Sequence, residues 1–119
     1  MYTAKIIDIG ELVPAFEEEN LVILFGSNVP DELKSICVIH EELTAEENPL
    51  KPGGHISFGN DSYEIVDVGN LANKNFEELG HISVYFREGD NEILPGAIQV
   101  KPAKFPTLSI GDEITISRN

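Results

Sequence analysis

Residues 21–40 read LVILFGSNVPDELKSICVIH, and the strongest indication of the fold lies in this stretch. It holds two short runs of apolar, mostly β-branched or aromatic residues, at 21–25 and 36–39, and runs of this length and composition favour buried strands over helices. Gly26 closes the first run, and Pro30 followed by two acidic residues is typical of the start of a short helix. We therefore expect two buried strands joined by a helical turn over residues 31–34, with His40 at the end of the second strand.

Further short strands are expected on both sides of this stretch. They span residues 3–9, 55–58, 62–68, 81–87, 96–101 and 113–117. Gly59, Asn60 and Asp61 form a tight-turn sequence, which predicts a hairpin between the second and third of these strands. Residues 70–79 have helical composition and end at Gly80, a suitable helix cap. Short strands at regular spacing predict an all-β fold, a small closed barrel with one or two short helical turns, in which residues 1–119 form one domain.

Composition restricts the classes of partner. The formal net charge is −13, and a surface of this charge repels nucleic acid and anionic membranes. It favours instead a protein partner that presents a basic surface. The single cysteine, Cys37, excludes an internal disulfide and fits a reducing compartment. With no signal-like start and no apolar run near the roughly 20 residues that span a bilayer, we expect a cytoplasmic protein without direct membrane insertion.

His40 is the first candidate for chemistry among the three histidines of the chain. Strand alternation places it on the same face as Ile36 and Val38, with Cys37 and Ile39 opposite. A neutral imidazole, with an ordinary pKa of about 6.5, is a nucleophile at neutral pH without help from a metal. The same position also suits a histidine that only forms hydrogen bonds at a strand end, and local sequence does not decide between the two roles.

The other polar candidates carry weaker signals. His81 is expected on the polar face of its strand, where it could bind a phosphoryl oxygen, carry the phosphate itself, or be solvated. His55, next to a glycine turn, fits an ordinary surface residue, and Cys37 fits a small buried apolar residue. The spacing of the three histidines matches no compact zinc motif, and the chain lacks a glycine-rich phosphate loop. The acidic runs are expected to be solvated loops; they are Glu17–Glu18–Glu19, Glu41–Glu42 and Glu46–Glu47.

Seven short motifs follow one another along the chain: residues 37–40 (CVIH), 52–53 (PG), 57–59 (SFG), 68–69 (VG), 75–81 (NFEELGH), 95–96 (PG) and Gly111. Their order and spacing resemble the IIA component of the glucitol/sorbitol-specific bacterial phosphotransferase system, over almost the whole chain. The resemblance implies a closed β-barrel that relays a phosphoryl group. The phosphocarrier HPr donates it, the sugar-specific IIB component receives it, and the membrane IIC component couples the relay to polyol uptake.

The resemblance also assigns roles to individual residues. The phosphorylated histidine of the family matches His40, and a second histidine matches His81, whereas His55 has no counterpart. It implies phosphorylation at Nε2 of His40, with His81 binding the phosphate or orienting the His40 ring. Phosphoryl transfer depends chiefly on positioning and on neutralisation of oxygen charge, so no cofactor or metal is expected. One departure is the acidic pair Glu41 and Glu42, because the family pattern is less acidic there.

Two other functions remain compatible with the sequence. The first is a non-enzymatic small β-barrel that binds a protein partner, with structural histidines; it predicts no incorporation of phosphate from any donor. The second is a small metal-dependent enzyme of the β-barrel type, which predicts a stoichiometric divalent ion in the purified protein. The oligomeric state and the identity of the polyol are not encoded in any motif.

Overall fold

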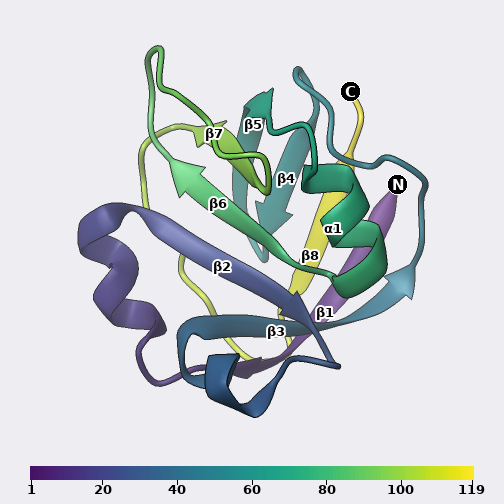
Figure 1. The fold of residues 1–119 in the computed structure, drawn as a ribbon, viewed down its shortest axis with the longest axis vertical. Helices are drawn as coiled ribbons and strands as arrows, with labels where there is room; N and C mark the ends of the chain where they lie inside the picture. The colour runs from purple at the N-terminus through teal and green to yellow at the C-terminus, as the bar shows by residue number, and fades with distance from the viewer.

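Eight strands close into a barrel in the computed structural model, which describes residues 1–119 (Figure 1). The strands are β1 (Tyr2–Ile9), β2 (Leu21–Gly26), β3 (Cys37–Thr44), β4 (His55–Phe58), β5 (Asp61–Val68), β6 (Ile82–Phe86), β7 (Ala97–Lys101) and β8 (Glu113–Ser117). Their order around the barrel is β1-β3-β2-β6-β7-β5-β4-β8. The expected all-β closed barrel is therefore confirmed, as is the hairpin formed by β4 and β5.

Three short helices accompany the barrel. They are the 3₁₀ helices η1 (Val13–Glu19) and η2 (Asp31–Ile36) and the α-helix α1 (Ala72–Leu79). Sequence reasoning predicted η2 and α1 but not η1, although Pro14 marks the start of η1. α1 ends where Gly80 takes a left-handed conformation, as expected for a helix cap. None of these helices has the length and apolar character needed to cross a membrane.

β2 and β3 lie parallel and adjacent, and they bury side chains on both of their faces. Leu24 and Val38 belong to the main barrel core of 21 buried residues. On the other face, Phe25, Val29, Cys37 and Ile39 form a second apolar cluster, against which Leu33 and Ile36 of η2 pack. Strands buried on both faces carry continuous apolar sequence, and this explains the two runs within residues 21–40.

Three local expectations were wrong. Ile36 ends η2 and packs against the second cluster, so it does not share the face of His40. Glu41 and Glu42 belong to β3, which continues to Thr44, because Lys5 and Ala4 of β1 pair with them. Glu17, Glu18 and Glu19 were expected in a loop but end η1. Among the three acidic runs, only Glu46 is partly buried, and the other carboxylates are exposed.

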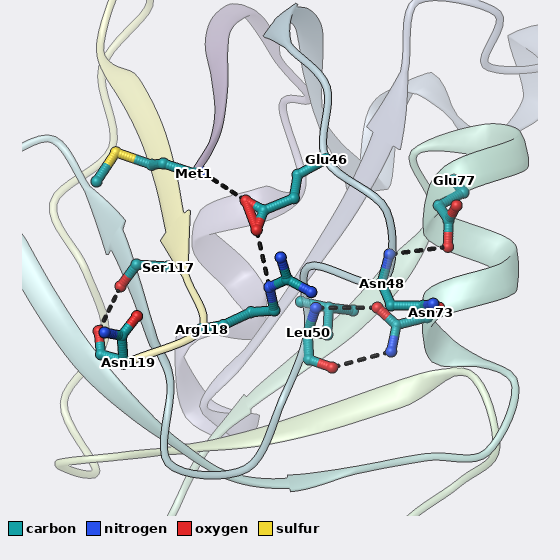
Figure 2. Close-up of polar contacts among 9 residues, drawn as sticks. All are labelled: Met1, Glu46, Asn48, Leu50, Asn73, Glu77, Ser117, Arg118 and Asn119. Atoms are coloured by element: carbon teal, nitrogen blue, oxygen red, sulfur yellow. Dashed lines mark hydrogen bonds and ion pairs between the residues drawn. The ribbon is translucent and has the colours of Figure 1, made fainter.

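Residues 45–54 connect β3 to β4 and are attached to both α1 and the chain termini (Figure 2). The side chain of Asn73 in α1 exchanges two hydrogen bonds of 2.9 Å with the backbone of Leu50. Glu77 of α1 accepts a hydrogen bond of 3.3 Å from the backbone of Asn48. Glu46 forms ion pairs with the amino group of Met1 and, at 2.8 Å, with Arg118. These contacts fix the position of α1 relative to the barrel.

Candidate functional site

His40 lines a pocket of about 220 Å³, although only 2% of the residue is exposed. The pocket lies where the end of β2, the middle of β3 and the C-terminal end of α1 meet. Its lining residues are Tyr2, Gly26, Ser27, Asn28, His40, Glu42, Phe76, Glu77, Glu78, Leu79 and Gly80. A buried imidazole therefore borders a space that opens between three segments far apart in the sequence.

The two ring nitrogens of His40 have different surroundings. The ring stacks on Phe76, with 5.7 Å between the ring centroids and 29° between their planes. Nδ1 is buried and has no hydrogen-bond partner. Nε2 faces Gly80, where a β-carbon would lie only 2.9 Å from it. Nε2 is therefore the nitrogen that lies against the glycine wall of the pocket.

Burial keeps the imidazole of His40 neutral. Desolvation lowers its pKa from 6.5 to about 4, because the charged form loses the solvation it has in water. Three carboxylates, those of Glu42, Glu77 and Glu78, also line the pocket, and no lysine or arginine does. At neutral pH the site thus combines an uncharged imidazole with a negatively charged wall.

Two glycines shape the wall beside His40. A β-carbon on Gly80 would lie 2.8 Å from the backbone nitrogen of Gly26, and one on Gly26 would lie 2.8 Å from the carbonyl oxygen of Leu79. The end of β2 and the end of α1 are therefore in direct backbone contact. Gly80 also has a φ of +67°, which side chains rarely permit. Gly26 and Gly80, which the sequence indicated as a strand end and a helix cap, also leave room for the His40 ring.

His81 directly follows Gly80 but is not among the residues that line the pocket. Its ring stacks on Phe25 of the second apolar cluster, with centroids 4.5 Å apart and planes 21° apart. Its backbone N–H donates to the carbonyl of Asn75 at 3.4 Å. Partial burial lowers the pKa of His81. No hydrogen bond joins the two imidazoles, and the contact between their segments is made by Gly80.

The remaining candidates lie elsewhere. His55 is exposed on β4, with Nδ1 3.4 Å from the carbonyl oxygen of Asn119. Cys37 is 1% exposed, and burial raises its pKa to about 11, so the thiol stays protonated at neutral pH. No group of three or more histidine, cysteine, aspartate or glutamate side chains is placed to hold a metal ion.

Sequence reasoning did not place several residues at this site. Tyr2, Phe76 and the carboxylates of α1 lie far from His40 in the sequence; Phe76 and these carboxylates belong to the motif at residues 75–81, but local sequence does not place them beside His40. α1 packs against β2 and β6 and stacks Phe76 on His40, whereas Tyr2 reaches the site on β1, which pairs with β3. Ser27 and Asn28 are polar residues that directly follow β2, which is an ordinary turn signal.

Comparison with known proteins gives one consistent result. The family described as "PTS system glucitol/sorbitol-specific IIA component" matches residues 1–115. Proteins of that description from Shigella flexneri and Escherichia coli are each 33% identical over 103 residues, which cover 84% of this chain and 80% of the relative. The crystal structure of a PTS system IIA component from Enterococcus faecalis is similar with a TM-score of 0.84 and 26% identity, covering 97% of this chain and 98% of that chain.

Proposed function

Because this chain belongs to the family of glucitol/sorbitol-specific IIA components of the phosphotransferase system, we propose that His40 carries the phosphoryl group. It accepts the group from phosphorylated HPr and passes it to the sugar-specific IIB component, while the membrane IIC component couples this relay to polyol uptake. The protein works in the cytoplasm as one domain, residues 1–119. It is by family a phosphotransferase component.

A single observation carries the assignment of His40. It is the only histidine that lines the pocket between β2, β3 and α1, and its pKa of about 4 leaves it neutral and nucleophilic at pH 7. His55 is exposed on another part of the barrel, and His81 stacks on Phe25 outside the pocket lining. His40 therefore combines a lone pair with a partly enclosed space that holds a phosphoryl group.

The reaction needs little from the chain beyond position. The lone pair on Nε2 of His40 attacks the phosphorus of phospho-HPr while the phosphorus–nitrogen bond to the donor histidine breaks. The donor ring, protonated on its other nitrogen, takes the bonding electrons and leaves as a neutral imidazole. Nδ1 of His40 carries the ring proton, so no proton has to be removed before attack. In the second transfer, the accepting group of IIB attacks the phosphorus on His40, and Nε2 of His40 leaves with the bonding electrons. Nε2 is favoured because Nδ1 is buried against the protein.

Partners supply the positive charge that the pocket lacks. Phosphoryl transfer requires neutralisation of the oxygen charge, and no lysine or arginine of this chain lines the pocket. Glu42, Glu77 and Glu78 instead attract basic side chains around the active histidine of HPr or around the accepting group of IIB. Those basic groups then lie next to the phosphoryl oxygens, so docking and charge neutralisation occur together.

His81 has a supporting role in this proposal. Its stack on Phe25 adjoins the close contact between Gly26 and Gly80, which borders Nε2 of His40. His81 therefore holds the glycine wall in place and through it positions the His40 ring. A direct hydrogen bond from His81 to the phosphoryl group is the other form of this role, and substitutions distinguish the two.

The relay can be tested with purified partners. Phosphoenolpyruvate, enzyme I and HPr should phosphorylate the wild-type chain, and addition of IIB should discharge it. His40→Gln should accept no phosphate, while the matched control His55→Gln should behave as wild type. Phosphorylation of His40→Gln at the wild-type rate would refute the assignment, and failure of the wild-type chain to accept phosphate would favour a non-enzymatic binding role.

A further inference from the structure

We propose that the turn formed by Ser27 and Asn28 binds the oxygens of the phosphoryl group on His40, so that these two residues act as positioning residues for transfer. This inference rests on the proposed function of His40 and adds to it the element that holds the transferred group. The turn connects β2 to η2 and contributes two of the residues that line the His40 pocket.

The turn offers hydrogen-bond donors that nothing in the protein uses. Val29 N–H donates to the Gly26 carbonyl at 3.1 Å, which makes Ser27 and Asn28 the two central residues of a β-turn. The backbone N–H of Asn28 has no backbone acceptor. The Ser27 hydroxyl and the Asn28 carboxamide are exposed and form no side-chain hydrogen bond. A phosphoryl oxygen accepts hydrogen bonds from all three kinds of group.

The rest of the pocket wall cannot take this role. Glu42, Glu77 and Glu78 are anionic, and the C-terminal end of α1 presents backbone carbonyls, which carry partial negative charge. Apart from the hydroxyl of Tyr2, the polar donors that line the pocket therefore belong to the Ser27–Asn28 turn. The electrostatics of the pocket direct the phosphoryl oxygens toward this turn and away from α1.

The position of the turn along β2 suits this role. Gly26, which directly precedes Ser27, pairs with His40 across the parallel β2–β3 ladder. Gly26 N and His40 Nε2 both lie within 3 Å of the same point, the β-carbon position beside Gly80. His40 itself is 98% buried, and the pocket that its ring borders is the one that Ser27 and Asn28 line.

The test uses the full chain phosphorylated on histidine with phosphoramidate, a small donor that needs no docking surface. In a proton–nitrogen correlation spectrum, the Asn28 amide proton should move downfield on phosphorylation by more than the amides of Glu77 and Glu78. If His40 is phosphorylated and the Asn28 amide does not move, the turn does not bind the phosphoryl group, while the proposed function stands. If phosphoramidate and phospho-HPr both leave His40 unmodified, the proposed function fails and this inference fails with it.

Substitutions give a second readout. Ser27→Ala combined with Asn28→Ala should slow phosphorylation by both phosphoramidate and phospho-HPr about tenfold, because loss of charge-stabilising donors raises the barrier whatever the donor. The control Ser109→Ala, at an exposed residue elsewhere, should change neither rate. A double variant that raises only the KM for phospho-HPr and reacts normally with phosphoramidate would show that the turn contacts the partner and not the phosphoryl group.

Discussion

Gly80 lies so close to His40 that a β-carbon built on it would be 2.9 Å from Nε2 of the imidazole. The same β-carbon would be 2.8 Å from the backbone nitrogen of Gly26. The absence of a side chain at position 80 therefore lets the His40 ring and the end of β2 pack directly against the end of α1. The first prediction is that Gly80→Ala slows phosphorylation of His40 by about tenfold or more, measured with phospho-HPr, because the methyl group clashes with Nε2 and with the Gly26 backbone and so displaces the His40 ring from its position.

Gly89→Ala is the matched control for this substitution. Gly89 also has a positive φ, +88°, but a β-carbon there meets nothing within 4 Å. Both substitutions should cost about 1 kcal/mol or more of unfolding free energy through backbone strain. Only Gly80→Ala should impair phosphorylation, and equal rates in the two variants would contradict the account of the glycine wall.

The second prediction concerns the titration of His40. Burial lowers its pKa to about 4, whereas an unburied imidazole has a pKa of 6.5. The ring signals of His40 in an NMR titration should therefore stay nearly constant from about pH 8 to pH 5. A midpoint near 6.5 for His40 would show that the ring is solvated and that the pocket geometry described here is incorrect.

The third prediction links the same group to stability. Between pH 6.5 and pH 4 the unfolded chain binds a proton at His40 and the folded chain does not, so unfolding free energy decreases as the pH is lowered through this window. The His40 contribution between pH 7 and pH 5 is about 2 kcal/mol. Urea unfolding should show that wild type loses about 2 kcal/mol more than His40→Gln over this interval. Equal losses in both proteins would argue against a depressed pKa.

The fourth prediction separates the two possible roles of His81. Phe in place of His81 keeps the aromatic stack on Phe25 and removes hydrogen bonding, whereas Gln keeps a hydrogen-bonding group and removes the stack. If His81 positions the glycine wall, His81→Phe should transfer phosphate at close to the wild-type rate and His81→Gln should be slower. The reverse order of rates would indicate a direct bond from His81 to the phosphoryl group.

The fifth prediction concerns the acidic rim. Neutralising Glu42 and Glu78 together, by Gln at both positions, should reduce the association rate with phospho-HPr severalfold at low salt and weaken its dependence on salt. Glu17→Gln combined with Glu18→Gln removes the same charge from η1, outside the His40 pocket, and serves as the control. If both double variants slow association equally, net charge and not the rim attracts the partner.

Residues 21–40 show how far the sequence could be interpreted alone. Two continuous apolar runs predicted buried strands, and the structure explains their continuity by a second cluster on the outer face of β2 and β3. The face of His40 followed from strand alternation with Val38, and Gly80 followed from its place after a helical pattern. Local patterns of this kind depend on neighbours in the chain, and they predict strands, turns and caps well.

The shape of the site required tertiary contacts that no local pattern contains. Phe76 stacks on His40 because α1 packs at the end of the barrel, and nothing within residues 72–79 indicates that neighbour. His81 was expected on the polar face of a strand, yet it precedes β6 and is half-buried against Phe25, since Gly80 turns the chain toward β2. The carboxylates Glu77 and Glu78 lie in a stretch for which the sequence predicted only a helix, and the tertiary structure places them in the same pocket as an imidazole.

The most direct test of the account is to identify the phosphorylated nitrogen. Long-range proton–nitrogen NMR spectra of the histidine rings, recorded before and after phosphorylation by HPr, report which ring nitrogen is bonded to phosphorus. The account predicts phosphorus coupling at Nε2 of His40 and no change of this kind in His55 or His81. Phosphorus bonded to Nδ1 of His40, or to either of the other two histidines, would contradict it.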